Sequence, residues 1–205
     1  MNRRKFMMTA SIGALATAAG AGTALAKKMV PPWVWTSKHG LANNMKKDTN
    51  PTQNDLEKYP RCPYCGMARK MWSHTRHLIQ YDDDSTEGTC SIHCASISLA
   101  LNMDRNPKNI WVGDAGAEAK IKPLIEVDKA SYALQPGKMG TMTGNRKWAF
   151  SDAAKAKATG GVIADFNGAL QAAYTDMGKN TIGIRKRRAE KRAHMLKKMK
   201  MMKGK

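Results

Sequence analysis

The chain has 205 residues, a size that accommodates one or two compact domains. Its formal net charge is +19 and its sequence pI is near 10, values that are typical of nucleic-acid-binding proteins. The charge is uneven, because residues 3–5 contribute +3 and residues 185–205 contribute +10, which leaves +6 for an ordinary basic domain between them.

The first 26 residues have the three parts of an export signal. The basic residues 3–5 precede a small, apolar run over 12–22, and Ala24-Leu25-Ala26 is an A-x-A cleavage signal. The run is too short, and too rich in alanine and glycine, to predict a membrane span. Arg3-Arg4 with Phe6 resembles a twin-arginine signal, and an ordinary Sec signal is the alternative. We therefore expect a periplasmic protein beginning at Lys27, which excludes nucleic acid as its partner. Its basic charge then suits an anionic membrane surface or another exported protein.

After the signal, an extended arm precedes the first folded unit. Prolines interrupt residues 27–60 and no hydrophobic period persists there, so we expect the arm to lack regular structure.

Residues 61–116 predict a ββαβ unit. Its elements are a strand at 78–81, a polar turn at 82–85, a strand at 86–90, a helix from the N-cap Ser91 to Met103, and a strand at 110–113. The triplet Asp82-Asp83-Asp84 is most simply the hairpin turn, with a calcium site as a remote alternative.

Residues 117–180 repeat this order, which predicts an α+β fold of two related ββαβ units. The expected elements are strands at 121–127 and 132–134, a glycine- and methionine-bearing loop at 137–145, a strand at 148–150, a helix at 151–158, a strand at 162–164 and a helix at 166–177. Residues 181–205 then form a basic, methionine-rich tail, which we expect to be a solvated C-terminal helix from Ile184 onward.

Four cysteines suggest three kinds of chemistry: Cys62, Cys65, Cys90 and Cys94. In an oxidising compartment they would suit two disulfides. The Cys-x-x-Cys spacing also suits a thioredoxin-like redox pair. However, such a pair opens a helix after a buried strand, and Tyr59-Pro60-Arg61 supplies no such strand. The third kind is a metal site, which both cysteine pairs could share or which the first pair could form alone.

The neighbouring residues favour a soft metal ion. A closed zinc site would use all four cysteines, or three of them with His93. Met67 follows Cys65-Gly66, and a thioether is a poor ligand for zinc but a good one for Cu(I). His74 and His77 are further candidates at i,i+3 spacing. The grouping therefore predicts Cu(I) at Cys62, Cys65 and Met67, with the roles of Cys90, His93 and Cys94 left open.

Methionines outside the cysteine cluster are the second signal. Met139 and Met142 lie in the loop 137–145, where core packing does not readily explain a thioether. Four more methionines crowd the basic tail. The simpler interpretation of the tail is a solvated basic helix whose methionines dock on lipid or protein. The alternative is a copper-collecting arm assisted by His194.

These motifs resemble the NosL family, copper-binding accessory proteins of nitrous oxide reductase maturation. The resemblance rests on Cys62-Pro63-Tyr64-Cys65-Gly66-Met67, on Gly140-Thr141-Met142 and on Trp148-Ala149-Phe150, and it extends from about Cys62 to Tyr174. It implies two related ββαβ units and Cu(I) binding outside the inner membrane. It places Cys65 and Met67 on the family's Cys-Gly-Met motif and Met142 on the methionine of its Pro-Met-Gly segment.

The chain departs from the family pattern at several points. Thr141 replaces the proline before Met142, no lipobox cysteine follows the signal, and the Cys90–Cys94 segment and the basic tail are not general features. Copper handling therefore transfers better than the identity of the client. Because no catalytic set is present, we expect a non-enzymatic Cu(I) chaperone that transfers its ion to an exported copper enzyme, or to its maturation proteins, by ligand exchange. The alternatives are a thiol-disulfide protein using Cys62 and Cys65, and a structural zinc protein.

Overall fold

The computed structural model describes residues 45–203, which lie within one compact unit spanning residues 32–205. The predicted export signal and residues 27–44 of the predicted arm lie outside the described residues, so their prediction stands on the sequence alone. The described part of the arm, residues 45–60, was expected to lack regular structure, and this expectation is wrong. It contains a short strand at Lys46–Lys47, which pairs with the first sheet, and a short helix at Asp55–Lys58. Among the described helices, none combines the length and the apolar character needed to cross a membrane.

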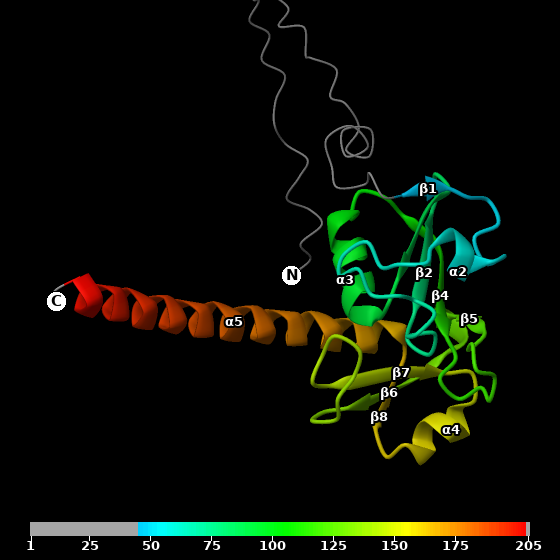
Figure 1. Ribbon diagram of the computed structural model, residues 1–205. Helices are drawn as coiled ribbons and strands as arrows, with labels where there is room; N and C mark the ends of the chain where they lie inside the picture. Colours follow the sequence, from blue (N-terminus) through cyan, green and yellow to red (C-terminus); the bar gives the residue numbers. More distant parts are fainter. Residues whose placement is uncertain (1–44, 204–205) are drawn as a thin grey trace, which may run out of the picture. The chain divides into compact units, whose positions relative to one another are not determined.

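The first unit contains a five-stranded antiparallel sheet with the order β1-β3-β2-β4-β5 (Figure 1). Its strands are β1 (Lys46–Lys47), β2 (His77–Tyr81), β3 (Ser85–Thr89), β4 (Pro107–Gly113) and β5 (Leu124–Glu126). Every residue of β2 and β3 is buried, as expected for strands inside a sheet that is covered on both faces. The short helix α2 (Asp55–Lys58) precedes the cysteine cluster, and α3 (Ile92–Leu101) connects β3 to β4.

The second unit repeats the first in a smaller form. Its three-stranded antiparallel sheet has the order β7-β6-β8, formed by β6 (Ser131–Gln135), β7 (Arg146–Phe150) and β8 (Val162–Ala164), and α4 (Ala153–Ala158) connects β7 to β8. In both units a hairpin is followed by a helix, and the last strand then pairs with the first strand of the hairpin. The predicted α+β fold of two related ββαβ units is confirmed.

One strand belongs to a different sheet than the sequence suggested. Residues 121–127 were expected to open the second unit, but β5 pairs with β4 of the first sheet, and the 3-10 turn at Val127–Lys129 leads from it into β6. An unpaired β4 would expose a row of backbone N–H and C=O groups, and β5 covers that edge. The segment therefore connects the two sheets. A common apolar core that includes Val112 of β4, Tyr132 of β6 and Phe166 packs across both units.

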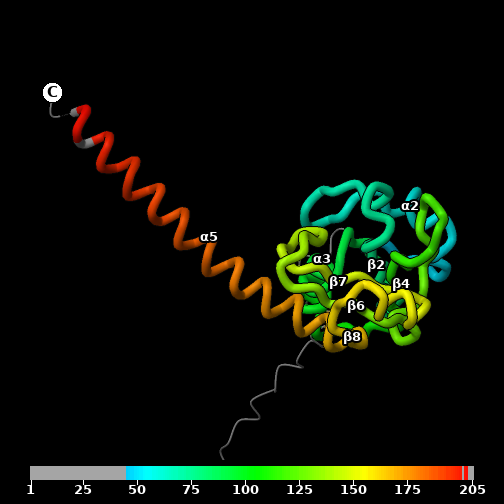
Figure 2. The backbone as a smooth tube through the Cα atoms, turned by 90° about the horizontal axis from the view of Figure 1, so that it is seen from below, coloured from blue at the N-terminus to red at the C-terminus, as the bar shows by residue number. Residues whose placement is uncertain are grey.

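The C-terminal helix α5 (Phe166–Lys203) is one continuous element of 38 residues, drawn orange to red in Figures 1 and 2. The sequence predicted a break near residues 178–183. The helix continues because Gly178 and Gly183 each cost only about 1 kcal/mol in a helix interior, and no proline stops it. Its first turns pack on α3, β6 and β8, whereas nearly all side chains beyond residue 177 are exposed. The charged C-terminal helix is thus confirmed as a continuation of α5, and the domain boundary at residue 180 stays a prediction.

Candidate metal centre

A tight turn between Cys62 and Met67 presents the first two cysteines. The Cys62 amide donates to the carbonyl of Met67 at 3.0 Å, and the Gly66 amide donates to the carbonyl of Cys62 at 2.9 Å. Gly66 has φ +74, a left-handed conformation that glycine adopts without steric cost. The turn is not the start of a helix, which is the position that a thioredoxin-like pair requires. Its backbone instead fixes where the sulfurs of Cys62 and Cys65 lie.

The other two cysteines come from the junction of β3 and α3. Cys90 directly follows β3, and Cys94 lies one helical turn later, in the first turn of α3. The hydroxyl of Thr75, just before β2, donates to the Cys90 carbonyl at 2.8 Å. Since His77 pairs with Thr89, the start of β2 and the end of β3 meet at the same edge of the sheet. The Cys62–Met67 turn packs at that edge.

All four sulfur atoms meet in one cluster. The cysteine sulfurs lie within 4.8 Å of one another, and the distances from Cys65 to Cys90, from Cys90 to Cys94 and from Cys94 to Cys65 are 3.4, 3.7 and 3.8 Å. All four are free thiols. Sulfurs arranged tetrahedrally around a metal at the usual 2.3 Å bond length would be about 3.8 Å apart. The structure thus places Cys90 and Cys94 beside the first pair, a question that the sequence left open.

Burial distinguishes the four sulfurs from one another. Cys62, Cys90 and Cys94 are at most 2% exposed, whereas Cys65 is half-buried. Tyr64, Cys65 and Met67 pack around the three buried cysteines. Cys65 is therefore the most accessible of the four cysteines, and Met67 packs against the sulfur cluster, while its role as a ligand stays a prediction.

Hydrogen bonds among the thiols set their protonation. Those from Cys90 and Cys94 stabilise a thiolate at Cys62 and lower its pKa, and the same contacts with Cys62 raise the pKa of Cys90 and of Cys94. The cluster therefore holds one thiolate readily and resists losing further protons while no cation is present. A bound metal ion would displace those protons, so metal affinity is expected to fall as the pH is lowered.

A buried charge network anchors the cysteine turn, and the sequence gave no sign of it. Arg69, with no exposed surface, donates to the Asp55 carboxylate at 3.0 Å and to the backbone carbonyls of Tyr59, His77 and Thr89. Arg76 donates to the same carboxylate. These bonds connect the turn to α2, β2 and β3. A Cβ atom at Gly88 would lie 2.5 Å from the Arg69 guanidinium carbon, so only glycine leaves space for it.

The loop that carries Met142 is fastened beside this centre. The hydroxyls of Thr75 and Thr141 are 2.9 Å apart, and Thr75 also bonds the Cys90 carbonyl. Met142 has φ +63 and is 40% exposed. Within the described residues its side chain is not among those packed on the sulfur cluster, so its role as a ligand stays a prediction.

The histidines differ sharply in their surroundings. His93 is half-buried, and its Nδ1 atom is buried without a hydrogen-bond partner among the described residues. Burial lowers its pKa, which favours the neutral imidazole that a metal requires, although His93 does not lie among the four sulfurs. His77 is buried, and its ring nitrogens contact the Thr75 carbonyl and the Tyr132 hydroxyl, so it is a structural residue. His74 stacks edge-on against Trp148.

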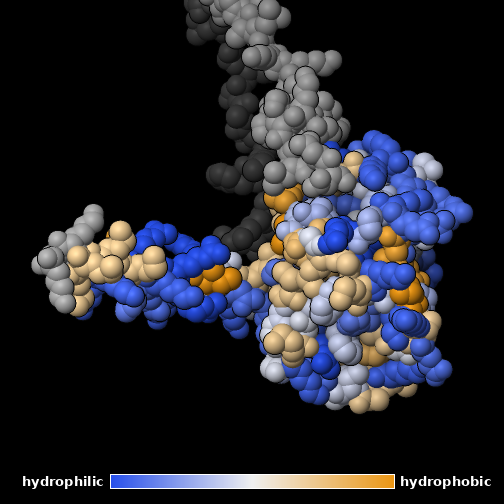
Figure 3. All heavy atoms as spheres, viewed as in Figure 1, coloured by the Kyte–Doolittle hydropathy of each residue, from blue (hydrophilic) through white to orange (hydrophobic). Residues whose placement is uncertain are grey.

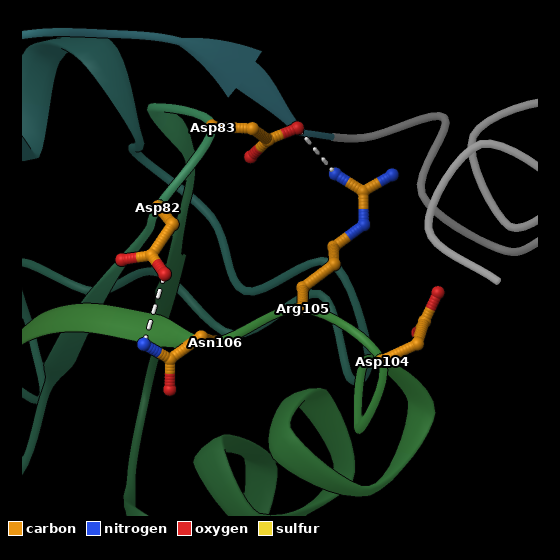
Figure 4. A pocket seen from close by; sticks show the side chains of 5 residues that line it. All are labelled: Asp82, Asp83, Asp104, Arg105 and Asn106. Atoms are coloured by element: carbon orange, nitrogen blue, oxygen red, sulfur yellow. Dashed lines mark hydrogen bonds and ion pairs between the residues drawn. The ribbon is translucent and has the colours of Figure 1, made fainter. Parts of the chain in front are cut away.

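The aspartate triplet forms the hairpin turn, as expected. Asp83 pairs with Arg105, and the Asn106 amide donates to Asp82 (Figure 4). Lys108 pairs with Asp84. Each of the three carboxylates therefore has a partner, either a nearby cation or an amide. A hollow of about 390 Å³ lies beside them, and it belongs to the far end of the hairpin from the cysteines.

Comparison with known proteins identifies one matching family. A model of the NosL family matches residues 53–188. Among solved structures, the chain is similar to the crystal structure of the copper chaperone NosL from Shewanella denitrificans. The identity is 21% and the TM-score 0.43, over 55% of this chain and 90% of that one. None of the curated proteins matches the sequence.

Proposed function

The chain belongs to the NosL family, and on that premise we propose that it is a non-enzymatic Cu(I) chaperone of the periplasm. The observation that carries the proposal is the cluster of four free thiols with the Met67 thioether packed against it. Thiolate and thioether sulfur are soft ligands that favour Cu(I). The proposed ligands are Cys62, Cys65, Met67, Cys90 and Cys94, with Met142 and His93 as further donors.

Met142 and His93 have different support. The Met142 loop is bonded through Thr141 and Thr75 to the backbone of Cys90, which fastens the residue next to Met142 beside the cysteine cluster. His93 precedes Cys94, and its Nδ1 atom has no hydrogen-bond partner among residues 45–203. Met142 and His93 both lie outside the four-sulfur cluster. They would therefore serve as additional metal ligands while the copper ion enters or leaves the site.

Transfer would proceed by ligand exchange at the accessible side of the cluster. The copper ion is the cargo, and Cys65 is the half-buried sulfur while the other three are covered. An incoming sulfur ligand from the acceptor would approach beside Cys65 and Met67 and displace the protein's sulfurs one at a time. Each cysteine that releases the ion takes up a proton from solvent, and the thiols of Cys90 and Cys94 can then donate hydrogen bonds to the remaining thiolate at Cys62.

The proposed client is an exported copper enzyme such as nitrous oxide reductase, or one of its maturation proteins. Support comes from the family and from the export signal of residues 1–26, which lies outside the described residues. Titration of the reduced protein with Cu(I) against a strong chelator tests the binding step. A protein that fails to compete for Cu(I) would overturn the proposal.

The variant Met67→Ala tests whether Met67 is a thioether ligand of the metal or only an apolar neighbour of the cysteines. Met67→Ala is expected to weaken Cu(I) binding roughly tenfold, about 1.4 kcal/mol, because one soft donor is lost while the thiolates remain. The same chelator competition measures the effect. Met103→Ala is the matched control, since Met103 is 85% exposed at the end of α3, and it should leave the affinity unchanged. Equal affinities in both variants would remove Met67 from the ligand set.

A structural zinc site is the second candidate function, and the sulfur spacing near 3.8 Å favours it. The two functions differ in what metal removal does. For a chaperone we expect the metal-free, reduced protein to keep its fold, because the apolar core of both units and the Arg69 network do not involve the sulfurs. A zinc-dependent fold would unfold on chelation. Circular dichroism before and after chelation, with metal analysis of protein purified without oxidation, decides between them.

Helix α5 is the proposed contact with an anionic membrane. Its exposed part combines dense Lys and Arg with exposed methionines, among them Met195, Met199 and Met202, and this mixture is visible near the C-terminal end in Figure 3. Basic residues near an anionic surface contribute about 1 kcal/mol each. Replacing Arg187, Arg188, Lys191 and Arg192 by glutamine is therefore expected to weaken binding to phosphatidylserine-containing vesicles at least about a hundredfold. Binding to purely zwitterionic vesicles, unaffected by salt, would contradict this.

A further inference from the structure

The two loops around the sulfur cluster carry positive charge and no carboxylate. Residues 61–76 and 136–148 together contain seven Lys or Arg residues and neither Asp nor Glu. Four of the seven are engaged: Arg69 and Arg76 with Asp55, Lys147 with Asp176, and Arg146 over the ring of Trp148. The other three are the exposed cations of these two loops.

Those three cations form what we call the cationic rim: Arg61, Lys70 and Lys138. All three are exposed, and none has an ion-pair partner within residues 45–203. Unpaired surface cations in a cluster create a positive potential that reaches about a Debye length, roughly 10 Å at 0.1 M salt.

The residues of the cationic rim come from the cysteine turn and from the loop fastened beside it. The Arg61 guanidinium donates to the Gly66 carbonyl at 3.0 Å, one residue from Cys65, and the bridge between Arg61 and Ala68 brings the chain before Lys70 to the same turn. Lys138 lies in the loop that Thr141 fastens to Thr75. Arg61 and Lys70 therefore lie in the segment that presents Cys65, and Lys138 lies in the loop that is fastened beside the metal centre.

A hollow beside the cluster extends the same charge. About 300 Å³ in volume, it reaches Cys62 and is lined by Lys46 and Arg61, and by Lys58, which pairs with Asp48. Its carboxylate, Glu87, is 3% exposed and bonded by Tyr64 and Ser98, so it presents no charge to solvent there. Exposed thioethers accompany the rim, with Met71 and Met139 each 76% exposed in the same two loops. The face thus combines positive charge with apolar contact area.

We propose that the copper acceptor docks on the cationic rim through a carboxylate-bearing protein surface. The proposal rests on the chaperone function above and adds the chemistry of the partner. Opposite charges at the mouth of the site would speed the encounter and orient the acceptor's sulfur toward Cys65. Complementary charge mainly raises the association rate, by tenfold or more at low ionic strength, and the gain falls steeply with salt.

Two synthetic acceptor peptides test this on the full-length chain. Both carry the same Cys-x-x-Cys motif, one flanked by glutamates and the other by glutamines. Stopped-flow transfer of Cu(I) from the loaded protein should be at least about tenfold faster to the glutamate peptide at low salt, with the two rates converging at high salt. The double variant Lys70→Glu with Lys138→Glu should abolish or reverse that preference. The control is Lys155→Glu with Lys157→Glu on the exposed face of α4, which should retain it.

The outcomes separate this inference from the chaperone function. Failure of the wild-type protein to bind Cu(I) overturns the chaperone function, while anisotropy of the labelled peptides on metal-free protein still measures docking. Equal transfer rates for both peptides, with copper bound normally, overturn the docking proposal alone. If the preference for the glutamate peptide persisted in the Lys70→Glu, Lys138→Glu variant but disappeared when the α5 cations were neutralised, the acidic surface would dock on α5. That outcome would likewise overturn the docking proposal.

Discussion

Replacing Cys65 by serine is expected to lower the Cu(I) affinity at least about a thousandfold, roughly 4 kcal/mol. Cys65 is the half-buried sulfur of the cluster, and its Sγ lies 3.4 Å from that of Cys90 and 3.8 Å from that of Cys94. A hydroxyl is a hard, neutral donor that does not replace a thiolate on a soft ion. Competition against a strong Cu(I) chelator, on reduced protein, measures the loss.

The substitution also distinguishes the candidate functions. Because Cys65 is not fully buried, Cys65→Ser should leave the circular dichroism spectrum and the urea midpoint nearly unchanged, so a lost affinity reports the site itself. Under the zinc alternative, all four cysteine variants would lower zinc affinity together and would also destabilise the fold. Unchanged Cu(I) binding in both Cys65→Ser and Met67→Ala would contradict the proposed ligand set.

Replacing Arg69 by methionine is expected to destabilise the protein by about 3–5 kcal/mol. The substitution roughly preserves volume, but it leaves the Asp55 carboxylate with one cation in place of two and removes donors from the carbonyls of Tyr59, His77 and Thr89. A buried carbonyl without a partner costs about 1–3 kcal/mol. Urea denaturation under reducing conditions measures the change in unfolding free energy.

A matched arginine serves as the control. Arg61 lies in the same turn but is exposed, with a single bond to the Gly66 carbonyl, so Arg61→Met should cost less than about 0.5 kcal/mol. If the two variants were equally stable, the network around Asp55 would not be what anchors the cysteine turn. A further expectation is that Arg69→Met weakens metal binding through misplacement of Cys62, even at temperatures where the variant is folded.

Features set by neighbouring residues in the chain could be predicted from the sequence. The hairpin of β2 and β3, the helix after Ser91, and β6 to β8 with α4 all follow from local apolar patterns bounded by turn residues. The Cys62–Met67 motif likewise contains its own turn signal in Gly66. Since these signals span only a few residues, the fold class and the centre of the candidate site were accessible without a structure.

Features that depend on distant residues were not accessible in the same way. Cys90 joins Cys65 across 25 positions, and their approach depends on the pairing of β2 with β3 and on the bonds of Arg69 to both strands. The partner of β5 is decided by which sheet edge lacks a neighbour, a property of the assembled fold. From the sequence, Arg69 is expected to be an ordinary surface cation in a basic segment. No neighbouring residue indicates that Asp55 will lie against it.

Because the order of strands is repeated, the two ββαβ units have corresponding positions between the second strand and the helix. The residues at these positions have different roles in the two units. Cys90 follows β3 and Ser91 caps α3; at the matching place Ser151 follows β7 and Asp152 caps α4. There the serine bonds Asp114, which precedes the link to β5, so the duplicate position secures a joint between the halves. One copy of the motif supplies a proposed metal ligand, and the other supplies a structural contact between the halves. Substitutions at Ser151 are therefore expected to change how the halves fit together, whereas substitutions at Cys90 are expected to change metal binding.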